Sequence, residues 1–244
     1  MELGASKVIF GVRTIKKGED AKAAIEQRTG KKDRIEVWPI DMGSYPSIKS
    51  FAEKASQLPQ LDIAILNAGI HNASYKTSDY GFEEDLQINA LSTAYLGLLL
   101  LPKLKASKTS THTPVLEIVT SGVHKTVELK DEQKQAENLL QSFNDSSTSF
   151  NARKNYAISK LLAMYVMQSL GKLAESSTGE LDVIVNSACV SLSRNMPLNF
   201  AADKPYSQEQ PNQTLQGTSR LLCRLQLLFC LRFSLEPLKM ALEV

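Results

Sequence analysis

Short apolar runs alternate with longer amphipathic stretches along most of this chain. A run of about four to eight apolar residues between turns predicts a strand, and apolar positions three or four apart predict a helix. The predicted strands cover residues 7–12, 34–40, 61–66, 115–120 and 181–186, and the predicted helices cover 17–29, 46–57, 82–105 and 152–173. Strands that alternate with helices form parallel sheets from βαβ units. We therefore expect an α/β fold with a Rossmann-like, doubly wound parallel sheet.

Some segments refine this picture. Residues 61–66 are almost continuously apolar, which is typical of a strand covered on both faces. Residues 124–152 are polar and predict an excursion over the surface. Near the end the pattern degrades, since residues 201–219 are loop-like and 220–244 are leucine-rich without a clear partner strand. The predicted sheet is therefore irregular at its C-terminal end.

Composition bounds the classes of function. A chain of 244 residues with 43% hydrophobic content can bury a substantial core, and we expect a single domain over residues 1–244. The 28 basic residues nearly balance the 26 acidic ones, so the net charge of +2 gives no reason to expect a nucleic acid partner. The cysteines have no metal-ligand spacing, so we predict no metal site and reduced intracellular thiols at Cys189, Cys223 and Cys230.

The sequence also bears on location. The first seven residues lack the basic-then-apolar order of a secretion signal. Residues 221–235 are very apolar but number only 15 and include Arg224 and Arg232, whereas a transmembrane helix needs about 20 apolar residues. We expect a buried or peripheral helix there and a cytoplasmic protein, with peripheral membrane contact left open.

The pair Tyr156 and Lys160 carries the most specific chemistry in the chain. Residues four apart lie on one face of a helix, so the ammonium can sit near the phenol. A tyrosine has a reference pKa of about 10, and a nearby cation favours its phenolate, which brings proton transfer into a useful range. The spacing alone is weak evidence, because Tyr45 and Lys49 repeat it at what we interpret as an ordinary helix start.

Order along the chain separates the two copies. Only Tyr156 follows a strand that ends in hydroxyl residues, Thr120 and Ser121, and its helix leads into another apolar strand. In an open parallel sheet, ligands bind beyond the carboxyl ends of the strands. Asn67, Ser121 and the residues after Asn186 are all predicted at such ends. This convergence predicts a site at that edge of the sheet.

These segments resemble the short-chain dehydrogenase/reductase family, within it the branch of retinol-dehydrogenase-like enzymes and fungal biosynthetic reductases. The resemblance covers about residues 3–196, and residues 197–244 are atypical. It implies that the segment formed by Asn67, Ala68 and Gly69 stabilises the sheet and lies along a nicotinamide cofactor. The residues that match the family's catalytic tetrad are Asn89, Ser121, Tyr156 and Lys160.

The resemblance implies a role for each residue of the tetrad. Tyr156 would give a proton to a carbonyl oxygen during reduction, or remove one from an alcohol during oxidation. Lys160 would favour the phenolate and hydrogen-bond the nicotinamide ribose. Ser121 would hold the substrate oxygen, and Asn89 would anchor a water in the proton relay. Taken alone, Asn89 could also be a helix residue whose side chain bonds to nearby backbone. Ser121 alone could also be a cap at the end of its strand.

The choice of cofactor depends on the end of the first strand. NAD-binding domains place an acid there, whereas this chain has Val12 followed by Arg13. Arginine at this position accommodates the 2′-phosphate of NADP, and its planar fork suits phosphate. We therefore predict NADP, with Lys17 assisting; Arg13 as a solvated surface charge is the alternative. By resemblance, Asp41 would contact the adenine.

The chain departs from the family pattern at both ends. No glycine-rich phosphate loop occurs in the first sixty residues, and the chain starts where the family's first helix would end. The strand at 7–12 is then expected to lose its usual neighbour, which leaves the sheet truncated. Near the other end, the chain reads Cys189-Val190-Ser191 where the family has Pro-Gly, and Asn195 stands at the family's usual threonine position. An incomplete or misassembled gene model and a decayed paralogue are both compatible with these departures.

Three functional hypotheses follow from the sequence. The first is an NADP-dependent oxidoreductase for a carbonyl or secondary alcohol of a small apolar molecule, such as a fungal secondary-metabolite intermediate. The second is a non-catalytic relative that keeps the site residues without the phosphate loop. The third, a nucleotide-sugar epimerase, shares the tyrosine–lysine spacing but needs a longer C-terminal substrate domain.

Overall fold

The computed structural model describes residues 4–127, 140, 143–144 and 150–189. Strands and helices alternate through this part of the chain, as the apolar pattern predicts. The elements, in chain order, are β1 Val8–Val12, α1 Ile15–Thr29, β2 Ile35–Pro39, α2 Tyr45–Ser56, β3 Ile63–Leu66, α3 Glu84–Leu86, η1 Gln87–Ser92, α4 Thr93–Ala106, β4 Val115–Thr120, η2 Gly122–Thr126, α6 Ala152–Leu173 and β5 Ile184–Cys189.

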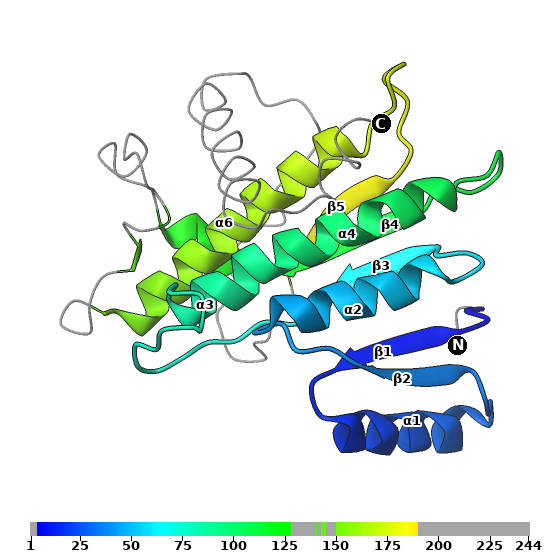
Figure 1. The fold of residues 1–244 in the computed structure, drawn as a ribbon, viewed down its shortest axis with the longest axis horizontal. Helices are drawn as coiled ribbons and strands as arrows, with labels where there is room; N and C mark the ends of the chain where they lie inside the picture. The colour runs from blue at the N-terminus through cyan, green and yellow to red at the C-terminus, as the bar shows by residue number, and fades with distance from the viewer. Residues whose placement is uncertain (1–3, 128–139, 141–142, 145–149, 190–244) are drawn as a thin grey trace, which may run out of the picture.

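All the strand pairs are parallel, but the strands form two separate sheets. β1 pairs with β2, and β3, β4 and β5 form a second sheet in that order. Figure 1 shows β1 and β3 running alongside each other, yet no ladder joins them among the described residues. The parallel α/β class is therefore confirmed. The strand at 7–12 also lacks a second neighbour in the described part, as the missing glycine-rich segment led us to expect.

The prediction that residues 61–66 form a strand covered on both faces is wrong. Ile63 and Ile65 are 58% and 62% exposed, whereas Ala64 and Leu66, which point the opposite way, are buried. Successive side chains of a strand point to opposite faces, and α4 packs against β3 on the face of Ala64 and Leu66. The other face of β3 keeps its apolar side chains in contact with solvent.

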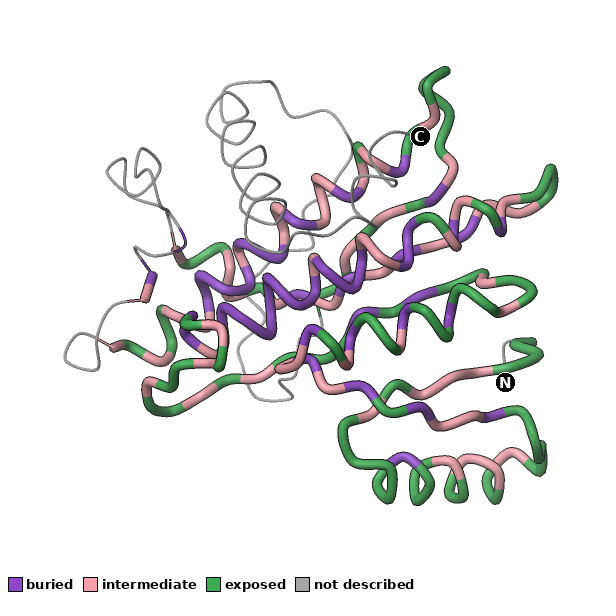
Figure 2. The backbone as a smooth tube through the Cα atoms, in the orientation of Figure 1, coloured by how far each residue is buried: buried purple, intermediate pink, exposed green. Residues whose placement is uncertain are grey.

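The core lies where α4 and α6 cover the three-stranded sheet, and Figure 2 shows a continuous buried stretch where η1 leads into α4. Leu104 and Leu116 are completely buried between these layers. Gly97 allows the two helices to approach closely, since an added Cβ would lie 2.6 Å from a methyl carbon of Leu170. This packing fixes α6, which carries Tyr156 and Lys160, against the sheet.

The predicted helix over residues 82–105 is present but not continuous. It begins with the short α3, passes through the π-helical η1 and only then becomes the α-helix α4. The Thr93 hydroxyl donates to the Ile88 carbonyl five residues earlier, at 3.2 Å, a spacing that suits the wider turn. π-Helical turns occur often at functional sites, and Asn89 lies within this one.

The last predicted strand is displaced by three residues, from 181–186 to Ile184–Cys189. Residues just before it close the turn after α6: Asp182 donates its backbone N–H to Ala174, and Leu181 forms an isolated bridge with Glu175. The ladder with β4 starts only at Ile184, whose N–H donates to Pro114.

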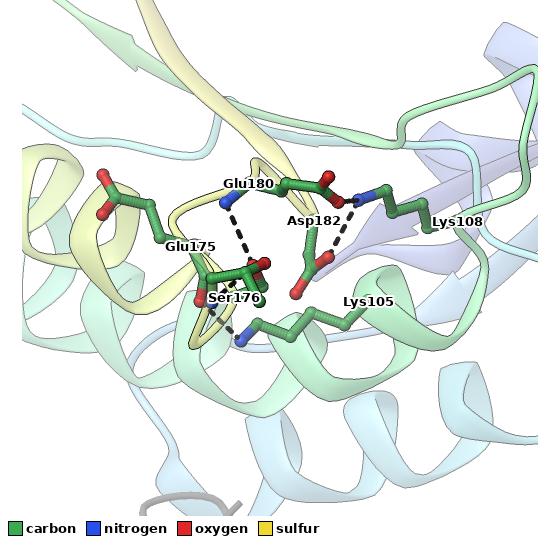
Figure 3. Close-up of polar contacts among 7 residues, drawn as sticks. Lys105, Lys108, Glu175, Ser176, Glu180 and Asp182 are labelled. Atoms are coloured by element: carbon green, nitrogen blue, oxygen red, sulfur yellow. Dashed lines mark hydrogen bonds and ion pairs between the residues drawn. The ribbon is translucent and has the colours of Figure 1, made fainter.

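Charged side chains join this turn to the last turn of α4 and to the loop after it (Figure 3). The Lys108 ammonium lies 3.0 Å from the Asp182 carboxylate and 3.9 Å from that of Glu180, and Lys105 donates to the Glu175 carbonyl at 3.4 Å. These contacts join the amino ends of β4 and β5, opposite the predicted site. Because such pairs are partly exposed, each contributes little to stability.

Several predictions concern residues outside the described part. They are the loop at 201–219, the leucine-rich segment 220–244 with its peripheral helix at 221–235, the departures at Val190, Ser191 and Asn195, and most of the polar stretch 124–152. Within the described residues, no helix is long and apolar enough to cross a membrane.

Candidate active site

The site is built at the carboxyl ends of β3 and β4, where the segment after each strand meets α6. Gly69, three residues after β3, lies so close to two polar side chains that an added Cβ would be 3.0 Å from the Asn89 Oδ1 and 3.3 Å from the Lys160 Nζ. Side-chain atoms rarely fit at such distances, which explains why glycine occupies this position. Gly69 therefore brings together three of the residues that the sequence singled out.

Asn89 joins the loop after β3 to α6. Its Oδ1 accepts from the Ile70 N–H at 2.8 Å, and its Nδ2 donates to the Ile70 carbonyl at 2.8 Å and to the Ser159 Oγ at 2.9 Å. The side chain is 2% exposed. Asn89 thus uses its amide to hold backbone and a neighbouring hydroxyl, and the role of anchoring a water stays a prediction.

Ser159 is a member of this cluster that the sequence reasoning missed. Its hydroxyl donates to the Tyr156 carbonyl at 2.8 Å and accepts from Asn89, and it is completely buried. The spacing of three residues from Tyr156 on a helix could have indicated that both lie on one face. Ser159 fixes the turn of α6 that carries Tyr156.

Lys160 reaches back across the end of β4. Its ammonium donates to the Val119 carbonyl at 3.2 Å and lies 5.8 Å from the centroid of the Tyr156 ring. Burial lowers the pKa of Lys160, because the charged form loses hydration, while Cys189 and Asp85 act in the opposite direction. An ammonium has three donors, so this buried cation can still bind ligand oxygens while it faces the phenol.

Ser121 follows β4 directly, in extended conformation, and is half-buried. Its carbonyl accepts the backbone N–H of His124 at 3.1 Å and lies 2.7 Å from the His124 Nδ1. Its hydroxyl makes no hydrogen bond to a described residue, so it is available to a ligand. The second tyrosine–lysine copy lies elsewhere, since Tyr45 opens α2 and is buried against Tyr80.

The residues predicted to bind the adenine end lie on the other sheet. Arg13 follows β1 and Lys17 lies in the first turn of α1, and both are exposed. Asp41 follows β2, where its carboxylate accepts from the Gly43 N–H at 2.8 Å and so shapes the turn before α2. No hydrogen bond or ion pair among the described residues joins these three to Tyr156 or Lys160. The predicted cofactor residues are thus divided between the two sheets.

An acidic group that the sequence reasoning missed supports the loop of the site. Asp85 is completely buried and accepts the Asn72 N–H at 3.0 Å, and Glu84 accepts from the Asn72 side chain at 2.8 Å. Burial raises the pKa of Asp85 to about 6, with the neighbouring Glu83 carboxylate acting in the same direction. Burial also raises the pKa of Glu83. The Asp85 carboxyl group, which holds the loop after β3 at Asn72, therefore resists ionisation.

This burial predicts a pH dependence of stability. Asp85 has a pKa of about 6 in the folded state against an ordinary 3.8. Its contribution is complete below about pH 4 and falls as pH rises to about 6, because over this range the folded state keeps a proton that the unfolded state has released. Asp85→Asn should raise the free energy of unfolding at pH 7.5 by up to about 3 kcal/mol.

Chemical denaturation from pH 4 to 8 measures this effect. The fall in stability between about pH 4 and 6 should be shallower for Asp85→Asn than for the parent. Asp79→Asn, which removes an exposed acid of the same loop, serves as the matched control and should follow the parent curve. An Asp85→Asn curve parallel to that of the parent would contradict the account of Asp85.

The nicotinamide end of a dinucleotide fits this arrangement. Gly69 leaves open the space that a Cβ would fill beside Asn89 and Lys160. The segment formed by Asn67, Ala68 and Gly69 is exposed, and the Lys160 ammonium can bind hydroxyl oxygens of a ribose. A phenol, a buried cation and a hydroxyl without a hydrogen bond to the described residues, all at one sheet edge, can transfer a proton and hold an oxygen.

Comparisons with known proteins agree with this geometry. Residues 1–112 match the family model described as short chain dehydrogenase. The chain is 42% identical over 196 residues to short-chain dehydrogenase/reductase phmF of Phaeosphaeria nodorum and 43% identical over 196 residues to ffsI of Aspergillus flavipes, covering 79% of this chain and 56% of each relative. The chain thus spans little more than half the length of these curated relatives.

A solved structure shows the same fold. An uncharacterized protein from Mycobacterium paratuberculosis superimposes with a TM-score of 0.58 at 26% sequence identity, over 77% of this chain and 59% of that protein. The similarity therefore extends over the described sheets and helices, not only over the short motifs.

Proposed function

This chain belongs to the short-chain dehydrogenase/reductase family, as the sequence resemblance predicted, and from this premise we propose that it is an NADP-dependent oxidoreductase. The reaction is hydride transfer between nicotinamide and a carbonyl or secondary alcohol. The observation that carries the proposal is the cluster of Gly69, Asn89, Tyr156 and Lys160 at the carboxyl ends of β3 and β4. Ligands of open parallel sheets bind at this edge.

The protein's own residues transfer the proton to or from the substrate oxygen and hold that oxygen in place. When bound, the cofactor supplies or accepts the hydride. Tyr156 donates the proton to the substrate oxygen in reduction, or removes it in oxidation, and the Lys160 cation stabilises the phenolate form. Ser121, whose hydroxyl is available, holds the substrate oxygen in place. Asn89 and Ser159 hold the loop after β3 in a fixed position relative to the turn of α6 that carries Tyr156.

We propose that the substrate is a small, fairly apolar molecule. By similarity to the fungal relatives, we propose that it is an intermediate of secondary metabolism. The similarity to fungal short-chain dehydrogenase/reductases supports this class. We also propose that the protein is cytoplasmic.

The preference for NADP is supported by Arg13 at the end of β1, with Lys17 one turn into α1. Arg13→Asp should reduce the preference for NADPH over NADH by about ten- to a hundredfold, because one charge-assisted phosphate contact stabilises by roughly 1.5–3 kcal/mol. Titration of each cofactor in whichever form of the protein binds dinucleotide measures the ratio. Arg28→Asp, at the far end of α1, is the matched control and should leave the ratio unchanged. Equal affinities of the parent for NADPH and NADH would refute the assignment.

A non-catalytic relative is the second candidate, favoured by one observation. The two sheets are not joined by a ladder among the described residues. A protein of this kind would keep Tyr156 and Lys160 without cradling the pyrophosphate. Turnover of a carbonyl substrate with NADPH, assayed in whichever form of the protein binds the dinucleotide, separates the two proposals, since the non-catalytic relative shows none.

A further inference from the structure

The imidazole of His71 lies on the ring of Tyr156. The two ring centroids are 4.7 Å apart and the ring planes are inclined by 28°, which is a stacked arrangement. His71 comes from the loop after β3, whereas Tyr156 comes from the first turns of α6, so the contact joins distant segments of the chain. His71 itself is exposed and Tyr156 is half-buried.

The backbone on both sides of His71 is fixed by buried side chains. Before it, Ile70 exchanges two hydrogen bonds of 2.8 Å with the Asn89 amide. After it, the Asn72 N–H donates to the Asp85 carboxylate at 3.0 Å, and the Asn72 side chain donates to Glu84 at 2.8 Å. With both neighbours held, the His71 Cα is fixed in position, and its ring is directed at Tyr156.

We propose that His71 is a positioning residue for Tyr156, whose stacked imidazole holds the phenol in its working orientation; this inference rests on the proposed oxidoreductase function. The ring of Tyr156 turns about two side-chain torsions, and fixing the backbone does not by itself fix the hydroxyl. Ser159 holds the Tyr156 carbonyl, and the Lys160 ammonium is 5.8 Å from the ring centroid. His71 supplies the ring-to-ring contact that these two do not.

Stacking of planar side chains favours one ring orientation by about two- to tenfold. A displaced catalytic group loses rate steeply, because proton transfer needs its donor within hydrogen-bond reach of the substrate oxygen. We therefore expect His71→Ala to lower kcat by about tenfold with KM changed by less than about twofold. His71→Phe keeps a planar ring without the imidazole nitrogens and should restore kcat to within about twofold of the parent.

The kinetic test compares these two variants with His112→Ala, which removes an imidazole from the loop before β4, far along the chain from the site. Loss with alanine, recovery with phenylalanine and no loss at His112 support positioning by the stack. A parental kcat for His71→Ala overturns the proposal, as does equal loss in the alanine and phenylalanine variants. These assays use whichever form of the protein turns over a carbonyl substrate with NADPH.

An independent test uses nuclear magnetic resonance of the histidine rings in the 244-residue chain. It contains only three histidines, so their signals are assigned by single substitutions. Stacking predicts ring-current-shifted His71 signals that move toward ordinary values in Tyr156→Leu, while the His112 signals stay in place. Unmoved His71 signals overturn the stack. Shifted His71 signals, together with no carbonyl turnover by a form of the protein that binds NADPH, leave the stack standing and refute the proposed function instead.

Discussion

Replacing Tyr156 with phenylalanine is expected to lower kcat by about 10²- to 10⁴-fold, the usual contribution of general acid–base catalysis. The change removes one oxygen from a half-buried ring and keeps the ring that stacks on His71. The hydrogen bond from Ser159 goes to the Tyr156 carbonyl, which the substitution keeps. Thermal unfolding and NADPH affinity should therefore stay close to those of the parent.

The matched control is the same substitution in the second tyrosine–lysine copy. The Tyr45 hydroxyl accepts from the Gln87 amide at 2.8 Å in the core between α2 and η1. Tyr45→Phe should cost about 1–3 kcal/mol of stability, because it leaves a buried donor unpaired, while kcat stays near that of the parent. The two variants thus separate loss of the acid from loss of structure. A parental kcat in Tyr156→Phe would remove this residue from the mechanism.

The sequence was sufficient to predict the features that depend on the period of its apolar residues and on the order of its strands and helices. The alternation of apolar strands and amphipathic helices predicted a parallel α/β fold, which is confirmed. The helix over 152–173 was predicted with the bounds that the structure shows. Its placement after a strand ending at Thr120 brought Lys160 to the carbonyl of Val119. The order of elements constrains where strand ends meet, so this part of the site could be predicted.

Other features depend on tertiary contacts that no local pattern contains. Residues 61–66 appeared fully buried, yet Ile63 and Ile65 are exposed because only one face of β3 is packed against a helix. The start of β5 moved to Ile184 because the preceding residues close a turn on α6. His71 and Asp85 have no spacing signature relative to Tyr156, and only the folded loop places His71 on the Tyr156 ring and Asp85 beside Asn72.

The edges of the two sheets that no described ladder joins lead to the prediction with the largest consequence for binding. β1 and β3 each present an edge without a ladder partner among the described residues, and Ile63 and Ile65 of β3 are 58% and 62% exposed. Unpaired edges and exposed apolar side chains favour association between chains. We therefore expect residues 1–244, expressed alone, to be poorly soluble or to bind NADPH very weakly.

The energetic argument concerns the pyrophosphate. In dinucleotide-binding folds, backbone N–H groups and a helix N-terminus stabilise its charges. Losing several charge-assisted hydrogen bonds at roughly 1.5–3 kcal/mol each can erase a micromolar affinity, which corresponds to only about 8 kcal/mol. The loss of strand pairing also lowers stability appreciably, because the free energy of unfolding of a whole domain is only about 5–15 kcal/mol.

Extending the chain at its N-terminus by an apolar strand followed by a glycine-rich loop should restore both solubility and NADPH binding. The strand can pair with the free edges of β1 and β3, and the loop supplies the phosphate contacts. A matched extension with alanines in place of the loop glycines should recover stability, seen in thermal unfolding, without recovering affinity, seen in calorimetry. Micromolar NADPH binding by residues 1–244 without any extension would show that Arg13, Lys17 and the cluster around Lys160 suffice to hold the dinucleotide.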